Sequence, residues 1–345
     1  MKIESDIKLT FDDVMIKPKR STLISRNDVS LHRSFKFKYS TLKWQGIPII
    51  AANMDTTGTI DMAKKFKEYN LLTALHKFYK YEDLEAHLNS NLLDNCILTI
   101  GEGDIPNFFT YIDFYDRYKF ILVDVANGYR ECFLEFIKKL RQTFPEKIII
   151  GGNVATREMT EALILAGADI VKIGIGPGAV CTTRKVTGCG YPQLSAISEC
   201  ADAAHGLNGH VIADGGCKSP GDVAKAFGAG ADFVMLGGML AAHDESGGDT
   251  VILNGNKYKI FYGMSSSQAQ TKYYNKVADY RASEGKIVRL LCKGPVENTI
   301  KEILGGLRSS HSYIGATNIK NFPKCCTFVR CTQTTNEVFS NLKAN

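Results

Sequence analysis

The strongest constraint on the fold of this chain is a repeat of short apolar segments, each ending in or near Gly, Asn, Asp or His. Eight such segments occur, at residues 47–52, 71–77, 96–101, 120–127, 148–154, 170–176, 210–215 and 233–238. They are apolar on both faces, which is typical of parallel strands covered by helices. Amphipathic stretches separate several of them, at residues 129–143, 156–166 and 221–228. We therefore expect strands and helices to alternate along the chain.

Eight strand–helix units within roughly 200 residues predict an α/β protein, a single-domain (β/α)8 or TIM barrel over residues 1–345. The alternative is a doubly wound sheet, which normally has fewer strands and a phosphate-binding loop at the first strand-to-helix turn. No such loop is seen there. The tripeptide Gly-Ala-Asp occurs at 167–169 and again at 230–232, each time before an apolar segment. This repetition indicates successive helix-to-strand junctions.

The pattern changes after the eighth apolar segment. Residues 246–262 contain two short β-like runs and predict a hairpin. Residues 265–292 are largely polar and predict a surface flap. A regular helical pattern over 295–307 predicts the helix that closes the barrel, and the chain from Asn318 onward is expected to form an irregular peripheral arm.

Composition argues against several classes of protein. The net charge is +6 and the charges are interspersed, whereas a nucleic-acid binder more often has a clustered basic stripe. No apolar run approaches the roughly 20 residues that span a bilayer. The ten cysteines are scattered through a long chain and the N-terminus lacks an apolar leader. We expect a cytoplasmic protein with mostly free thiols.

The loop from Gly174 to Arg184, after the sixth segment, contains three glycines and a proline ahead of Cys181. Loops at the carboxyl ends of barrel strands carry function. Carbonyls freed in such a loop can bind a monovalent cation, and a cation such as Arg184 near a thiol favours its reactive thiolate form. The alternative is a loop that only turns the chain, with Cys181 as a small filler.

Two Gly-Gly pairs follow the seventh and eighth segments, Gly215-Gly216 and Gly237-Gly238. Barrels commonly bind phosphate with the loops at these two positions, through glycine amides. Asp214, directly before the first pair, suits a ribose diol because a carboxylate accepts from both hydroxyls. Tight helix–sheet packing is the alternative explanation for the glycines.

Other polar residues at strand ends are weaker candidates. Glu284, in the predicted flap, suits a general acid or a purine edge, although a flap glutamate is often only a solvated charge. Asp124 follows the fourth segment, Asn53-Met-Asp55 the first, and His76-Lys77 the second, and structural packing explains these three equally well. His205 and His210 flank a helix-to-strand junction and are expected to be structural. We see no metal-ligand spacing and no Walker A or Rossmann signature.

Together these residues resemble the IMP dehydrogenase/GMP reductase family over nearly the whole chain. The matching motifs are Leu9-Thr-Phe-Asp-Asp-Val14, Asn53-Met-Asp55, Asp124-Val-Ala-Asn-Gly128, Gly174 to Arg184, Asp214-Gly-Gly216, Met235-Leu-Gly-Gly238 and Tyr262-Gly-Met-Ser-Ser266. The cysteine loop combined with both Gly-Gly pairs is highly specific. The resemblance implies a catalytic cysteine at Cys181 and a site for a purine nucleoside monophosphate.

The reductase branch of the family is the better match. Only 18 residues, 78–95, lie between the second and third segments, which is too few for the regulatory CBS module that the dehydrogenase branch usually carries there. The segments 202–206, 280–285 and 296–309 also look like the reductase branch. The alternatives are an IMP dehydrogenase without CBS domains, a non-catalytic purine-nucleotide sensor and, more weakly, a barrel that binds FMN.

By this resemblance the reaction is NADPH-dependent reductive deamination of GMP to IMP and ammonia. The Cys181 thiolate attacks C2 of guanine, Thr183 and Glu284 relay a proton to the 2-amino group, and ammonia leaves a covalent thioimidate that hydride reduces. The implied GMP contacts are Asp214, Gly215, Gly216, Gly237, Gly238, Gly263, Met264, Ser265, Arg281, Ala282, Ser283, Glu284 and Gly285.

The resemblance also implies cofactor, cation and subunit contacts. The nicotinamide-cofactor contacts are Lys77, Asp124, Val125, Ala126, Ile175, Gly176, Met264, Tyr280 and Arg281, with Ser25, Arg26, Ser309, Ser310, His311 and Ser312 reaching the adenosine end across a subunit boundary. A potassium ion is expected among Gly176, Gly178, Cys181 and Arg184, in a homotetramer. Two places depart from the family: His311 stands where a small residue or cysteine is expected, and residues 99–103 lack the usual serine-rich run.

Overall fold

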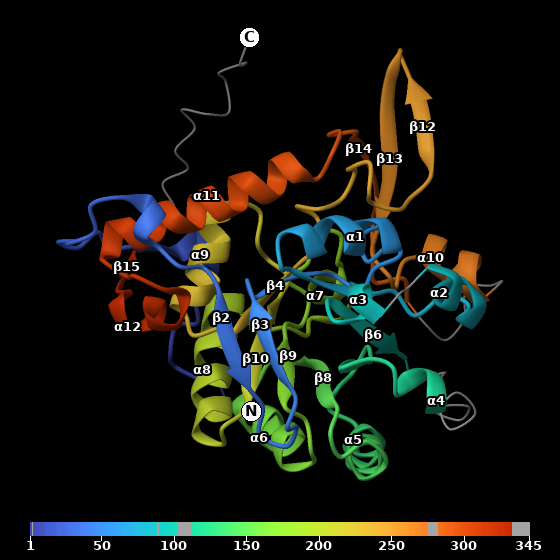
Figure 1. Cartoon of the computed structure of the whole chain (residues 1–345), viewed down its shortest axis with the longest axis horizontal. Coiled ribbons are helices and arrows are strands. Elements are labelled where there is room, and N and C mark those ends of the chain that lie inside the picture. The colour runs from blue at the N-terminus through green and yellow to red at the C-terminus, as the bar shows by residue number, and fades with distance from the viewer. Residues whose placement is uncertain (2, 88–89, 102–111, 275–281, 333–345) are drawn as a thin grey trace.

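The computed structural model describes residues 1, 3–87, 90–101, 112–274 and 282–332. Its centre is a closed barrel of parallel strands, joined in chain order and closed by pairing of the last strand with the first (Figure 1). The strands are β4 (Ile49–Ala51), β5 (Leu72–Leu75), β6 (Cys96–Ile100), β7 (Phe120–Asp124), β8 (Ile148–Val154), β9 (Ile170–Ile173), β10 (His210–Asp214) and β11 (Phe233–Leu236). The predicted (β/α)8 barrel is therefore confirmed, and each of the eight apolar segments contains one strand.

Helices connect the strands, and most of them cover the outside of the barrel. They are α1 (Ile60–Glu68), α2 (Tyr81–His87), α3 (Ser90–Leu93), α4 (Ile112–Tyr115), α5 (Glu131–Thr143), α6 (Arg157–Leu165), α7 (Thr183–Thr187), α8 (Gln193–Gly206) and α9 (Pro220–Gly228). In α5, Phe133, Phe136, Ile137 and Leu140 are buried, at the spacing that gives a helix one apolar face. The three helices predicted from amphipathic stretches, now α5, α6 and α9, are confirmed to within two residues.

An aromatic plug closes the amino-terminal end of the barrel. It comes from the hairpin β2 (Arg33–Lys36) and β3 (Lys43–Gly46). The Phe35 ring stacks on Phe233, the first residue of β11, with ring centroids 4.3 Å apart, and Trp44 packs edge-on against Phe120, the first residue of β7. The sequence analysis made no prediction for this hairpin. With one end closed, the carboxyl ends of the strands are left to form a site.

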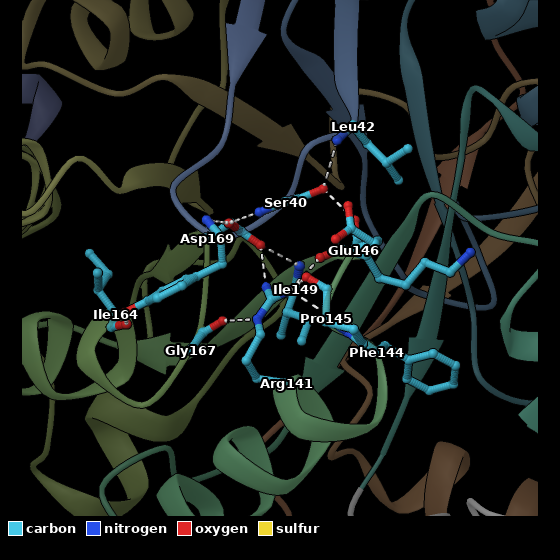
Figure 2. A network of polar contacts seen from close by, with 12 residues as sticks. Ser40, Leu42, Arg141, Phe144, Pro145, Glu146, Ile149, Ile164, Gly167 and Asp169 are labelled. Carbon is cyan, nitrogen blue, oxygen red and sulfur yellow. Dashed lines mark hydrogen bonds and ion pairs between the residues drawn. The ribbon is translucent and has the colours of Figure 1, made fainter.

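Both Gly-Ala-Asp junctions place a buried aspartate at the plugged end. Figure 2 shows Asp169, which accepts hydrogen bonds from the backbone N–H groups of Ile149 (3.0 Å) and Tyr39 (2.8 Å) and pairs with Arg141 at 2.5 Å. Asp232 repeats the arrangement, because it accepts from the N–H of Val211 and contacts charged or ionisable side chains. Two of the side chains that contact Asp232 are the imidazole rings of His205 and His210, both predicted to be structural.

Beyond β11 the chain forms a three-stranded antiparallel sheet of β12 (Thr250–Leu253), β13 (Asn256–Tyr262) and β14 (Ile287–Leu291). The β12–β13 hairpin was predicted, and it projects away from the barrel (Figure 1). The predicted flap, about 265–292, contains helix α10 (Ser267–Tyr274) and strand β14. β14 was not predicted, and residues 275–281 lie outside the described residues, so a flap stays a prediction.

The C-terminal part of the chain is more regular than expected. Helix α11 (Glu297–Ile314) runs seven residues beyond the predicted end at 307, because His311 and Ile314 continue its buried stripe and Gly315 supplies the left-handed cap, with φ 72°. The predicted irregular arm instead holds helix α12 (Phe322–Cys325) and strand β15 (Phe328–Arg330), which pairs with β1 (Val14–Ile16). No helix in the described part of the chain is long and apolar enough to cross a membrane.

Candidate active site

A cavity of about 230 Å³ opens at the carboxyl ends of the barrel strands. Its walls come from the ends of β4, β10 and β11, from the loop after β9, and from the segment after β13. The predicted site residues among its lining are Gly178, Cys181, Thr183, Asp214, Gly215, Gly216, Gly237, Gly238, Gly263, Met264, Ser265 and Glu284. The fold thus gathers at one cavity residues that are spread over more than 100 positions of the sequence.

The glycine-rich loop leaves β9 at Gly174 and carries Cys181 into this cavity. Gly176 has φ 76°, a left-handed conformation that glycine adopts at little cost. The Arg184 guanidinium donates to the carbonyl oxygens of Ile175 (3.1 Å) and Tyr191. Arg184 therefore stabilises the loop by hydrogen bonds to backbone carbonyls. These two bonds explain the position of the guanidinium without a direct contact to the Cys181 thiol.

Cys181, Thr183 and Glu284 form one hydrogen-bonded series. The Cys181 thiol lies 3.3 Å from the Thr183 hydroxyl, and that hydroxyl donates to Glu284 Oε2 at 2.6 Å. Cys181 and Thr183 come from the loop after β9, with Thr183 as the first residue of α7. Glu284 comes from the segment just before β14. A proton can pass between the carboxylate and the space next to the thiol through the hydroxyl alone.

Backbone pairing holds Glu284 in this position. Its carbonyl accepts from Thr182 N–H (2.9 Å) and its own N–H donates to Ser265 O (3.1 Å). One residue further on, Gly285 forms an antiparallel bridge with Cys181. Backbone hydrogen bonds therefore hold the segment of Glu284 to the cysteine loop on one side and to the segment after β13 on the other.

The two Gly-Gly pairs also line the cavity and expose backbone there. Gly215 and Gly216 both have positive φ, 87° and 90°, and a Cβ on Gly215 would lie 2.9 Å from the Pro177 ring. A Cβ on Gly237 would lie 3.2 Å from Met54 Sδ. The positive φ values of Gly215 and Gly216 disfavour any side chain there, and the bare backbone of the two pairs forms a cradle that suits an anion.

A buried lysine was missed by the sequence analysis. Lys172, in the middle of β9, is 3% exposed and contacts Asp124 Oδ1 at 2.8 Å and Asp214 Oδ2 at 2.7 Å. Burial alone lowers the pKa of Lys172, but the two carboxylates outweigh burial and raise it above its usual value. A single lysine inside an apolar, doubly covered strand was the available signal, because lysines are almost never buried without a partner.

A second cluster of polar contacts fastens α10 to the rim around Asp55, which is 6% exposed. Asp55 Oδ2 accepts from the hydroxyls of Tyr262 and Tyr273 (2.5 Å for Tyr273) and from Lys272 Nζ at 3.0 Å. The Tyr273 ring also stacks on Phe78, after β5. Asp55, which had no assigned role, thus ties together the ends of β4, β5 and β13 near the cavity.

The predicted cofactor residues fall into two groups in space. Asp124 ends β7 and Lys77 follows β5, two barrel strands with β6 between them. The ring of His76 stays neutral at pH 7 because burial lowers its pKa to about 4. The turn Arg26–Asp28, next to Ser25, packs against α11, which carries Ser309–Ser312. This second group lies outside the cavity lining.

Three predicted site residues are either buried away from the cavity or outside the described residues. His311 is fully buried, its Nδ1 lies 2.7 Å from Leu307 O, and its ring packs on Phe322. Because the His311 side chain is fully buried, it does not reach a ligand, and we withdraw His311 as an adenosine contact. Tyr280 and Arg281 lie outside the described residues. No group of three or more His, Cys, Asp or Glu in the described ranges suits a metal ion.

The geometry can now be compared with known proteins. Residues 115–338 match the family model described as IMP dehydrogenase / GMP reductase domain. The chain belongs to this family. It is 56% identical to GMP reductase 2 of Mus musculus over 98% of this chain and 99% of the relative. It is 55% identical to GMP reductase of Escherichia coli O81 (strain ED1a) and of Shigella boydii serotype 4 (strain Sb227), each over 99% of this chain and 100% of the relative.

These comparisons bear on the choice between the two branches of the IMP dehydrogenase / GMP reductase family. The relatives reported above carry the reductase name and align from end to end. The 18-residue stretch between the second and third predicted strands contains α2 and α3. The assignment to the reductase branch, made from short motifs, is thus supported over the full length of the chain.

Proposed function

We propose that this protein is a GMP reductase that converts GMP to IMP and ammonia with NADPH. The observation that carries the proposal is the hydrogen-bonded series Cys181–Thr183–Glu284, which lines the same cavity as the exposed backbone of the Gly-Gly pairs. A thiol beside a proton relay suits covalent displacement of a poor leaving group. The names of relatives that are 55–56% identical agree with this chemistry.

In the proposed complex, the substrate is held by the backbone and one carboxylate. The amides of Gly215, Gly216, Gly237 and Gly238 suit the phosphate, because bare backbone lets the N–H groups approach an anion. Asp214 is 21% exposed at the cavity, with one oxygen on Lys172. Its remaining acceptor positions suit the two ribose hydroxyls. The other proposed contacts are Gly263, Met264, Ser265, Arg281, Ala282, Ser283, Glu284 and Gly285.

The chemical step begins at the Cys181 thiolate, which forms a bond to C2 of the guanine ring. Glu284 passes a proton through the Thr183 hydroxyl to the 2-amino group, which then leaves as ammonia when the C2–N bond breaks. A thioimidate to Cys181 remains. Covalent attachment divides one difficult displacement into two easier steps, and the relay contributes on the order of 10²–10⁴-fold as general acid catalysis.

When bound, NADPH would supply the hydride that reduces C2. The C2–S bond would then break, and Cys181 would return to the thiolate. The net reaction consumes GMP, NADPH and two protons and yields IMP, NADP⁺ and ammonium. Lys77 and Asp124 fit the cofactor, because an ammonium and a partly exposed carboxylate offer a donor and an acceptor to its nicotinamide end. Val125, Ala126, Ile175, Gly176, Met264, Tyr280 and Arg281 complete the proposed contacts.

A monovalent cation, potassium, is part of the proposal. The carbonyl oxygens of Gly178 and Arg184 each accept one backbone hydrogen bond, at 3.0 and 3.1 Å. A carbonyl has two lone pairs, so each retains one for an ion. With Gly176 and Cys181 they are the proposed ligands, and the ion would hold the cysteine loop in its curved form.

We further propose a homotetramer in the cytoplasm. Ser25 and Arg26 lie beside α11 and outside the cavity lining, as expected for residues that reach the adenosine end of a cofactor bound to a neighbouring subunit, together with Ser309, Ser310 and Ser312. None of the ten cysteines forms a disulfide, which suits a reducing compartment.

The test is a spectrophotometric assay with purified protein, GMP and NADPH, with ammonia measured as the second product. We expect one ammonia per NADPH oxidised. Cys181→Ala should abolish turnover, while the control Cys189→Ala, an exposed cysteine just beyond α7, should keep it. Reduction of NAD with IMP but no oxidation of NADPH with GMP would indicate a dehydrogenase instead. Nucleotide binding without turnover in either direction would indicate a sensor.

A further inference from the structure

The rim of the barrel contains a polar layer built from four neighbouring strands. Asp124 ends β7, Asn153 lies near the end of β8, Lys172 lies in β9 and Asp214 ends β10. Lys172 contacts both carboxylates, at 2.8 and 2.7 Å. Asn153 Nδ2 donates to Asp214 Oδ2 at 2.9 Å and to the Gly174 carbonyl at 2.8 Å. One ammonium therefore connects the acidic side chains at the ends of β7 and β10, of which Asp214 lines the cavity.

The three charged groups differ in their access to solvent. The Lys172 side chain is 3% exposed, whereas Asp214 is 21% and Asp124 is 32% exposed. The ammonium lies beneath the two carboxylates and does not line the cavity. Lys172 contacts one oxygen of each carboxylate, and both carboxylates keep more access to solvent than the ammonium does. Lys172 can thus act on a ligand only through Asp124 and Asp214.

We propose that Lys172 is a positioning residue that serves the substrate and cofactor subsites together. Its ammonium draws Asp214 Oδ2 and Asp124 Oδ1 toward the barrel axis, which leaves the free oxygens aimed at the ribose hydroxyls and at the nicotinamide end of the cofactor. It also offsets the repulsion between two like charges that are held on the same rim. This inference rests on the proposed function, because that function assigns one ligand to each carboxylate.

The chain offers no second group for this task among the described contacts of the two carboxylates. Asp214 has Asn153 as an additional donor, but an amide carries no charge to offset a carboxylate. Within the described residues, Lys172 is the only side-chain partner of Asp124. Loss of the ammonium should therefore disturb ligand binding at both subsites. The effect should be larger at the cofactor subsite, which contains Asp124.

Steady-state kinetics of Lys172→Met test the proposal, with each substrate varied in turn. Methionine keeps the length of the apolar stem and removes the charge. We expect the KM for GMP and the KM for NADPH both to rise by about 10- to 100-fold, since each ligand loses an oriented charged acceptor. Asp214→Asn should raise only the GMP value and Asp124→Asn only the NADPH value. A purely structural lysine would instead lower the amount of active enzyme and leave both KM values unchanged.

The single variant leaves two carboxylates without a cation and can fail to fold. The double variant Lys172→Met/Asp124→Asn removes one of those charges, which restores the net charge of the cluster. We expect it to fold and to bind GMP about tenfold more weakly than Asp124→Asn alone, as measured by isothermal titration calorimetry. Equal GMP affinity in the two variants would overturn the proposal, because Asp214 would then be oriented without Lys172.

The outcome is separable from failure of the proposed function. Calorimetry with GMP and wild-type protein tests the substrate assignment before any variant is made, and the assay with GMP and NADPH tests the reaction. If wild-type protein binds and turns over GMP but Lys172→Met keeps both KM values, only the role of Lys172 is contradicted. If wild-type protein does not bind GMP, the proposed function fails first, and Lys172 loses the ligands that this role requires.

Discussion

The two ends of the barrel use aspartates in opposite ways. At the plugged end, Asp169 and Asp232 are 0% and 1% exposed and accept hydrogen bonds from backbone N–H groups and from charged or ionisable side chains. At the open end, Asp124 and Asp214 are 32% and 21% exposed and share the single ammonium of Lys172. Both pairs lie at strand ends, and both have a cation as partner.

The two pairs of aspartates differ in whether any hydrogen-bond acceptor positions of the carboxylates remain free. A carboxylate has about four lone-pair positions. In Asp169 these positions are occupied by hydrogen bonds from Tyr39, Ser40, Ile149 and Arg141. This residue therefore serves stability. Asp214 keeps positions that face a cavity, so it can serve a ligand. Four substitutions or conditions test this contrast between a stabilising end and a binding end, from the largest expected effect to the smallest.

The largest effect is expected on turnover at the open end. Glu284→Gln removes the proton that Thr183 relays, and kcat should fall by about 10²–10⁴-fold. The free energy of unfolding should stay within about 0.5 kcal/mol of the wild-type value, since the carboxylate lies at a cavity wall. Parallel kinetics and urea unfolding measure both quantities. The control Glu135→Gln, on the exposed side of α5, should change neither, and a variant that unfolds early with normal kcat would reverse the assignment.

The next effect is on stability at the plugged end. Asp169→Asn leaves Arg141 buried without its charge partner, and the free energy of unfolding should fall by about 3–5 kcal/mol. The KM values for both ligands should be unchanged in the folded fraction. Asp61→Asn is the matched control, because that carboxylate is 71% exposed and its ion pair contributes about 0–1 kcal/mol. Altered ligand affinity in Asp169→Asn would show that the two ends are coupled.

A smaller effect is expected on substrate affinity. Asp214→Asn weakens two hydrogen bonds to the ribose, and the KM for GMP should rise by about 10–100-fold. Deoxyguanosine monophosphate lacks the 2′-hydroxyl and provides the comparison ligand. The wild-type preference for GMP over this analogue should shrink in the variant. An unchanged preference would mean that Asp214 does not contact the ribose.

The smallest effect is a pH dependence of stability at the plugged end. Burial by itself lowers the pKa of His210, but the Asp232 carboxylate outweighs burial and raises it above 6.5. The folded state therefore binds the proton more tightly than the unfolded state, and the stabilisation is complete below pH 6.5 and is lost as pH rises through the folded-state pKa. The difference in unfolding free energy between wild type and His210→Gln should narrow from pH 6 to pH 9. A difference that stays constant would indicate a neutral imidazole throughout.

Much of the fold could be predicted from the sequence because parallel strands covered on both sides are apolar along their whole length. That signal found all eight barrel strands and the side of the barrel that carries the site. The same signal hid Lys172, since one charged residue within an apolar strand has partners 48 and 42 positions away. The plug at residues 33–46 was missed for a related reason: its aromatic residues pack against strand starts that are remote in sequence.

The sequence by itself determined which residues are available for chemistry: a cysteine in a glycine-rich loop, two Gly-Gly pairs and acidic side chains at strand ends. Only the tertiary structure decided how they combine. Glu284 reaches Thr183 across 101 positions of sequence because the segment around Gly285 pairs with the cysteine loop. It also decided which aspartates are saturated and which are open to a ligand. Hydrogen-bond saturation depends on neighbours in space, and no local pattern of residues records it.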